Sequence, residues 1–158
     1  MRFTNLKKYA AVAAFLLLFA FSGAAQTSNK PKPLPTTLPA ANTQSAIKSS
    51  PAYAEVLLRK TELEATLDDL IGEFTEEYPK VKETRFALGL IRKEFDKILA
   101  VGDAAKLSLA LGKLIVRKVE LETDVWALLQ KYSDAHDEVK RAKRKVATYE
   151  KAIKEILP

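Results

Sequence analysis

The second half of the folded region repeats the first at a spacing of 58 residues. Residues 52–99 align without a gap on residues 110–157, and 12 of the 48 aligned positions are identical. Both copies carry the segment Arg-Lys-x-Glu-Leu-Glu, at 59–64 and at 117–122. Two amphipathic helices can match through composition alone, but a shared turn segment as well favours a true duplication. A duplicated chain is expected to fold as two similar units.

Each copy carries apolar residues at alternating steps of three and four, which is typical of a coiled-coil seam. The seam residues of the first copy are Tyr53, Val56, Leu63, Leu67, Leu70 and Phe74, followed by Val81, Leu88, Ile91, Phe95 and Ile98. Those of the second are Leu107, Leu111, Leu114, Leu121, Val125, Leu128 and Tyr132, followed by Val139, Ala142, Val146, Tyr149, Ile153 and Ile156. The pattern predicts two long helices in each copy.

Turn chemistry separates the predicted helices. Pro79 suits the first turn of a helix, where its missing N–H costs no hydrogen bond. Ser133 and Asp134 are good N-caps for the last helix. Gly102 and Asp103 mark the end of one helix and the start of the next. Short connections favour antiparallel neighbours.

We therefore predict an all-α fold of two tandem antiparallel helical hairpins, with four helices and coiled-coil-like seams. The first hairpin repeat covers residues 52–102 and the second covers 103–158. A lysine interrupts each seam at the same place, at Lys60 and Lys118. A buried lysine could fix the helix register, or each side chain could extend along the edge of the seam to water.

Residues 1–25 have the pattern of a secretory signal peptide. Arg2, Lys7 and Lys8 precede an apolar run at 9–21, and small residues end at Ala25. Thirteen apolar residues are too few for a membrane-spanning helix, which needs about 20. We expect export to the periplasm or the extracellular space, with cleavage after residue 25. The alternative is an uncleaved N-terminal membrane anchor.

Residues 26–51 are predicted to form a Pro-rich, disordered linker. Five prolines lie between positions 31 and 51, and the segment has too little apolar content to fold alone. Such a segment would hold the helical region away from a membrane or wall, or form a tail without a function of its own.

The net charge of +6 comes entirely from the first 51 residues, because residues 52–158 hold 20 basic and 20 acidic side chains. Charge also divides between the repeats, with −3 over 52–99 and +3 over 100–158. Nucleic-acid binding is therefore not expected. The two halves are complementary and could pack within one chain or head to tail between chains.

Composition points away from an enzyme. The chain has no cysteine and one histidine, so thiol chemistry and multi-histidine metal centres are excluded. It shows no nucleophile–base pair and no Gly-rich phosphate loop. We expect no catalytic residues, no metal and no cofactor.

Two features are candidate interaction sites. The densest charge run comprises Lys140, Arg141, Lys143, Arg144 and Lys145. It could contact nucleic acid, anionic lipid head groups or an acidic polysaccharide, but no aromatic residue lies within it for base stacking. The alternative is a solvated face that pairs with acids of the first repeat. The single tryptophan, Trp126, lies off the seam and is expected at a second helix interface or an oligomer contact.

Further apolar residues lie beside the seams and widen the apolar face beyond what a two-helix contact needs. These are Leu57, Leu58, Ile71, Leu90, Leu99, Ile115, Val116 and Leu129. We expect a homo-oligomer; the alternative is a self-contained bundle within one chain.

One turn resembles a segment of polysaccharide chain-length determinants and exopolysaccharide export proteins, whose periplasmic helices carry Tyr-Thr-x-x-His-Pro-x-Val. The two matching segments are Phe74-Thr75-Glu76-Glu77-Tyr78-Pro79-Lys80-Val81 and Tyr132-Ser133-Asp134-Ala135-His136-Asp137-Glu138-Val139. The resemblance covers the helical region alone. That family also has membrane helices on both sides of its periplasmic part and an α/β base domain. This sequence has one N-terminal apolar run, and we expect neither a second membrane helix nor an α/β domain in it.

The resemblance and the architecture together predict a non-enzymatic coiled-coil structural or interaction module of the bacterial cell envelope, accessory to polysaccharide export and with an envelope protein as partner. The alternative function is a small periplasmic chaperone or envelope-stress protein built from helical hairpins.

Overall fold

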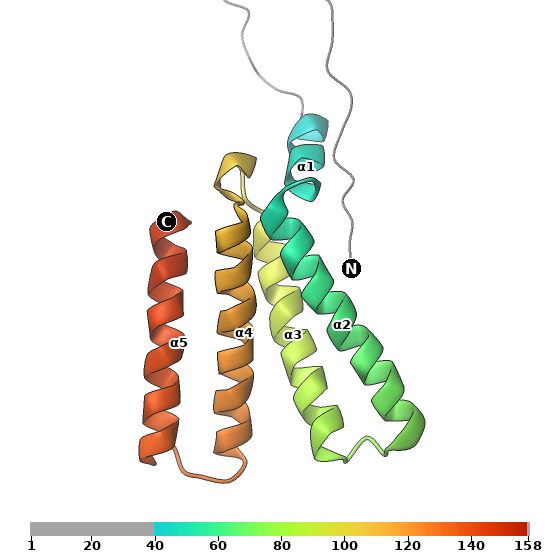
Figure 1. Cartoon of the computed structure of the whole chain (residues 1–158), viewed down its shortest axis with the longest axis vertical. Helices are drawn as coiled ribbons and strands as arrows, with labels where there is room; N and C mark the ends of the chain where they lie inside the picture. The colour runs from blue at the N-terminus through green and yellow to red at the C-terminus, as the bar shows by residue number, and fades with distance from the viewer. Residues whose placement is uncertain (1–39, 158) are drawn as a thin grey trace, which may run out of the picture. The chain divides into compact units, whose positions relative to one another are not determined.

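A computed structural model describes residues 40–157, which fold into helices and connecting turns without a strand (Figure 1). The helices are α1 (Ala40–Lys48), α2 (Pro51–Glu73), α3 (Pro79–Leu99), the 3₁₀ turn η1 (Ala104–Lys106), α4 (Leu109–Leu129) and α5 (Asp137–Ile156). The predicted all-α class is confirmed for this part of the chain. The predicted signal peptide and the first part of the linker, residues 1–39, lie outside the described residues.

Helix α1 lies inside the range predicted as linker. The prediction of disorder over 26–51 is wrong for residues 40–48, because Ile47 is only 2% exposed and joins the core. No proline lies between Pro39 and Pro51, so nothing prevents a helix there. The helix packs against α2, α3 and η1.

The helices of the second half begin 58 residues after those of the first. Helices α2 and α4 begin at Pro51 and Leu109, and α3 and α5 begin at Pro79 and Asp137. The serine before α2 and the serine before α4 act as equivalent N-caps. Their hydroxyl oxygens accept from the backbone N–H three residues later, each at 3.3 Å. The same local rules therefore start the same helices in both halves.

The two turns that follow α2 and α4 are also alike. Phe74 stacks on Tyr78 and Tyr132 stacks on His136, each with ring centroids 4.2 Å apart. Pro79 occupies the first turn of α3, as predicted.

The prediction that Ser133 or Asp134 caps α5 is wrong. The N-cap is His136, whose Nδ1 accepts from the backbone N–H of Glu138 at 3.3 Å. Similarly, Asp103 caps only the short turn η1, by accepting from the N–H of Ala105 at 2.9 Å, and Ser108 caps α4. Both helices therefore begin later than predicted: α5 follows the turn in which His136 stacks on Tyr132, and α4 follows the extended residue Ser108.

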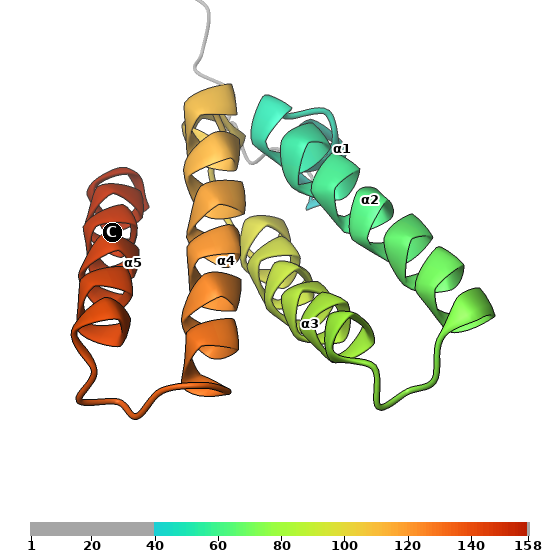
Figure 2. The same ribbon diagram turned by 60° about the horizontal axis from the view of Figure 1, so that its bottom comes forward.

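Helix α4 lies between α5 and the α2–α3 pair (Figures 1 and 2). It packs extensively against all three, whereas α5 packs mainly on α4. The apolar core is formed where α4 meets α2 and α3, with help from α1. It contains Ile47, Ala52, Val56, Leu63, Ala87, Leu88, Ile91, Ile98, Leu107, Leu111, Ile115 and Val119. None of the described helices is long and apolar enough to cross a membrane.

Helix α4 approaches α2 closely at Gly112. A Cβ atom added there would lie 2.8 Å from the Cβ of Glu55 and 2.9 Å from the Cα of Ala52. Such distances are too short for ordinary carbon contacts, so glycine sets the spacing of the two helices at this point.

The variant Gly112→Ala should therefore unfold more easily than the wild type. We expect a loss of about 1–3 kcal/mol from overpacking, despite the higher helix propensity of alanine. Gly89→Ala is the matched control, because nothing lies within 4 Å of a Cβ at that position in α3. It should gain up to about 1 kcal/mol. Urea unfolding followed by circular dichroism measures both, and equal gains would contradict the close packing.

Candidate functional site

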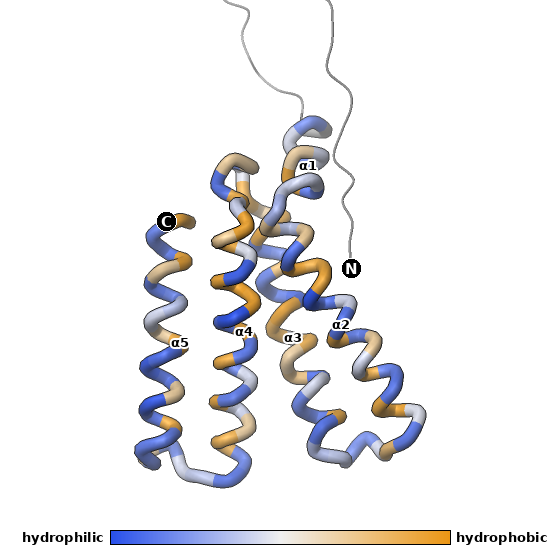
Figure 3. The backbone as a smooth tube through the Cα atoms, viewed as in Figure 1, coloured by the Kyte–Doolittle hydropathy of each residue, from blue (hydrophilic) through white to orange (hydrophobic). Residues whose placement is uncertain are grey.

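Helix α5 is amphipathic, but its apolar face is only partly covered. Of its residues only Val139 is fully buried, while Ala142, Val146, Tyr149 and Ile153 are half-buried. Its opposite face is polar along most of its length (Figure 3). An amphipathic helix normally buries its apolar stripe against a continuous core. Because α5 rests mainly on α4, a groove remains open on each side of the contact.

The first of these, the α4–α5 groove, has a volume of about 650 Å³. Its apolar floor comes from both helices, and its rim carries basic side chains together with two acids. It is lined by Leu121, Asp124, Ala127, Leu128, Lys131, Glu138, Arg141, Ala142 and Lys145. It can accept an apolar ridge flanked by negative charge.

The second, the tryptophan groove, lies where α3, α4 and α5 meet and has a volume of about 330 Å³. It is lined by Phe86, Leu90, Glu122, Val125, Trp126, Leu129, Lys143, Val146, Ala147 and Glu150. Trp126 stacks on Phe86 of α3, with ring centroids 5.1 Å apart and an interplanar angle of 17°. The predicted helix-interface location of Trp126 thus falls between α3 and α4.

The five basic residues singled out from the sequence are all exposed, and α5 distributes them around its surface. Lys143 reaches the tryptophan groove, and Arg141 and Lys145 line the α4–α5 groove. Lys140 pairs with Asp137 at 3.9 Å, and Lys143 pairs with Asp134. Pairing with acids of the first repeat, the alternative considered from the sequence, is therefore not what the described residues show for these two lysines.

A buried ion pair joins α3 to α4. The Nζ of Lys118 donates to Oε1 of Glu94 at 2.7 Å and lies 3.6 Å from Oε1 of Glu122. The side chains of Lys118 and Glu94 are only 9% and 7% exposed. Lys97 also donates to Glu94 at 2.7 Å. Of the two interpretations of the seam lysines, Lys118 takes the buried one, while Lys60 is half-buried and pairs with Glu64 on its own helix.

The pKa values follow from burial and pairing. Burial raises the pKa of Glu94, but hydrogen bonds from Lys118 and Lys97 outweigh it, so the pKa lies below the usual value. Burial lowers the pKa of Lys118, but the hydrogen bond to Glu94 and the negative charges of Glu94, Glu122 and Glu150 together outweigh that effect, so the pKa is raised. Burial raises the pKa of Glu122; the charge of Lys118 opposes this rise and the neighbouring Glu94 adds to it.

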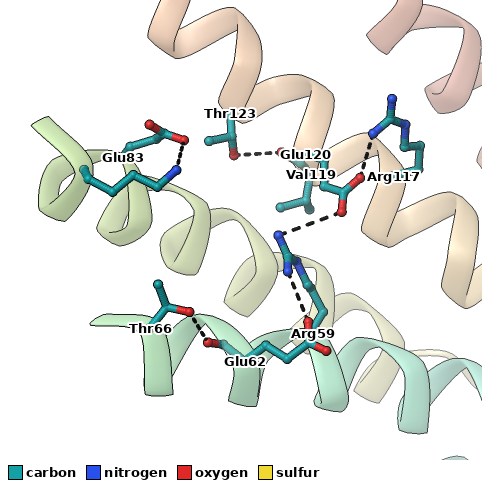
Figure 4. A network of polar contacts seen from close by, with 9 residues as sticks. Arg59, Glu62, Thr66, Glu83, Arg117, Val119, Glu120 and Thr123 are labelled. Carbon is teal, nitrogen blue, oxygen red and sulfur yellow. Dashed lines mark hydrogen bonds and ion pairs between the residues drawn. The ribbon is translucent and has the colours of Figure 1, made fainter. Parts of the chain in front are cut away.

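A second polar network joins α2 to α4 (Figure 4). Arg59 donates to Glu62 on its own helix at 3.1 Å and lies 3.8 Å from Oε1 of Glu120 on α4. Arg117 donates to Glu120 at 2.8 Å. These partly exposed pairs contribute little each, but they fix the charge pattern across the contact.

Sequence reasoning identified Lys118 as an interruption of the seam but gave no sign of its partner. Glu94 lies 24 residues earlier and on a different helix, so local spacing does not connect them. Among the described residues no cluster of histidine, aspartate and glutamate could hold a metal ion.

No protein-family model, no curated protein and no solved structure matches this chain. None of these comparisons links it to polysaccharide export.

Removing one partner of the buried pair should be costly. Glu94→Gln leaves Lys118 with only the more distant Glu122, and Lys118→Met leaves Glu94 with only the exposed Lys97. Each variant weakens the pairing of a buried charge, and we expect each to lower the free energy of unfolding by about 3 kcal/mol. The double variant Glu94→Leu with Lys118→Met removes both charges and should lose less than either single variant. Urea unfolding at neutral pH measures all three.

The pH dependence provides the control. Because the folded-state pKa of Glu94 lies below its ordinary value of 4.5, its pairing stabilises the fold above that pH and is lost as the pH falls through the lowered value. The wild type should lose more stability between pH 7 and pH 3 than the double variant does. The buried pair would be contradicted if the double variant lost as much free energy of unfolding as the two single variants together and lost stability in acid as the wild type does.

Proposed function

We propose that this chain is an exported, non-enzymatic helical interaction module of the bacterial envelope, built from two tandem helical hairpins, α2–α3 and α4–α5. The observation that carries the proposal is the half-covered apolar face of α5, which leaves grooves beside exposed basic side chains. The signal-like pattern of residues 1–25 supports export. Exposed apolar grooves with a polar rim commonly mark sites where a protein binds a partner.

The tryptophan groove is the surface we assign to a protein partner. Trp126 and Phe86 offer a flat, rigid aromatic surface, which is a common anchor at protein interfaces. Leu129, at the open edge of the groove, is 40% exposed. The charged side chains that line the groove are Lys143, Glu122 and Glu150. These features fit an amphipathic helix of a partner protein, with its apolar ridge on Trp126.

Trp126 is the single tryptophan of the chain, so its fluorescence reports directly on this groove. A synthetic helical peptide with leucine on one face and glutamate on the other should shift the emission of the full chain in a saturable way. A peptide of the same composition in scrambled order should not, because it lacks a continuous apolar face.

Matched variants locate the binding. Leu129→Glu places a negative charge in the groove and should weaken peptide binding by about tenfold or more. Leu109→Glu is the control, because Leu109 is 46% exposed at the opposite end of the same helix. Equal binding to both variants, or to the scrambled peptide, would overturn the assignment. Tighter binding of an unfolded protein than of the helical peptide would instead support the small-chaperone function.

A further inference from the structure

Helix α4 packs over the groove between α2 and α3 of the first hairpin, and a pocket of about 430 Å³ remains between the three helices. On the α2–α3 side this groove is lined by Arg59, Leu63, Thr66, Lys80, Glu83, Thr84 and Ala87, and α4 closes it with Arg117, Val119, Glu120, Thr123 and Asp124. Both helices of the first hairpin thus pack against the leading helix of the second.

The α4–α5 groove is the same groove one repeat later. Adding 58 to each lining residue of the first hairpin except Arg59 gives Leu121, Asp124, Glu138, Arg141, Ala142 and Lys145, and all six line the α4–α5 groove. Among the described residues no helix lies in it. A solenoid-like repeat fills such a groove with the leading helix of the next unit.

The repeat equivalent of α4 is α2, and the outer face of α2 has no partner among the described residues. Leu57 and Leu58 correspond to Ile115 and Val116, but they are 38% and 56% exposed where Ile115 is 1% exposed. Ala54, Thr61 and Ala65 continue the same face and are also exposed. Helix α2 is therefore apolar or small on two opposite sides, which is expected of a helix buried on both.

We propose that α2 of a second copy of this chain occupies the α4–α5 groove, so that copies add head to tail. This contact uses a different surface from the tryptophan groove, and each can fail without the other. The outer face of α2 consists of the positions that, 58 residues later in α4, contact the first hairpin.

Charge supports this occupant at two equivalent positions. Within one chain Arg59 of the first hairpin lies near Glu120 of α4. At the contact between copies the equivalent residues are Arg117 of one copy and Glu62 of the next, which also have opposite charges. The stacked pair Phe86–Trp126 becomes Arg144 with Asp68, an opposite-charge pair. Neither Arg144 nor Asp68 has an ion-pair partner among the described residues. Complementary charge of this kind selects orientation and partner.

Two differences make the contact between copies weaker than the contact within one. The buried Lys118–Glu94 pair has Lys60 and Ala152 at the equivalent positions, so it has no counterpart. Gly112 corresponds to Ala54, whose Cβ prevents an equally close approach. Association should therefore depend on protein concentration.

Sedimentation equilibrium tests the proposal. The sample is the full chain, expressed with its own N-terminal residues and purified in the form that the cells export. The average mass should rise with concentration beyond that of a dimer, because a head-to-tail contact leaves one groove and one α2 face free. Asp68→Arg or Arg144→Asp alone places like charges opposite each other and should raise the dissociation constant by about tenfold or more. Lys93→Glu, an exposed charge reversal on α3, is the control and should associate as the wild type does.

Mixing the two variants gives the decisive result. The α2 face that carries Asp68→Arg would meet the groove that carries Arg144→Asp, which restores an opposite-charge pair with its signs exchanged. The next contact along would join the native Asp68 of one variant to the native Arg144 of the other. An equimolar mixture should therefore associate as the wild type does. A monomer mass that is unchanged on tenfold dilution, a mass that stops at the dimer, or a mixture no stronger than either variant would each overturn the proposal.

Discussion

The rest of the fold depends on the packing of α4 against α2 and α3. Gly112 allows the backbones of α4 and α2 to approach, and the apolar residues Leu111, Ile115 and Val119 fill the space toward α2 and α3. The same helix carries Lys118, whose ammonium group stays charged because Glu94 lies opposite. A buried charge that must be matched disfavours other registers of α4, so the contact has one alignment.

This contact makes the two halves unequal although they share one pattern. Helix α4 packs on both α2 and α3, whereas among the described residues no helix lies in the equivalent groove of α4 and α5. Equivalent positions therefore differ in burial: Ile91 of α3 is 0% exposed, while its counterpart Tyr149 of α5 is only half-buried. In an array of two repeats, each end has a surface that no further repeat covers. The surfaces that we assign to association between copies are these two end surfaces.

The local features of the fold could be predicted from the sequence. The seam spacing predicted the helices on either side of each turn, and Pro79 marked the start of α3. Helix α1 was missed because its nine residues carry only one large apolar side chain, Ile47, which depends on tertiary packing. The cap at His136 was missed because stacking on Tyr132, and not side-chain type alone, determines the helix start.

The candidate site was predicted only in part. The charge run and Trp126 could be recognised as unusual. The sequence did not show that Lys143 lines one groove and that Arg141 and Lys145 line another, because the grooves arise from the way α5 lies on α4. The Lys118–Glu94 pair required knowledge of which helices meet. Local periodicity carries no information on contacts between residues on different helices, and these contacts shape both grooves.

Hydrogen exchange of the full chain at high dilution tests the central role of α4 most directly. The amides of residues 109–129 should be among the slowest to exchange, together with the central turns of α2 and α3. Those of residues 137–156 should exchange at least about tenfold faster, because α5 can separate from α4 without opening the core. Equal protection of α4 and α5, or faster exchange in α4 than in α5, would contradict the account.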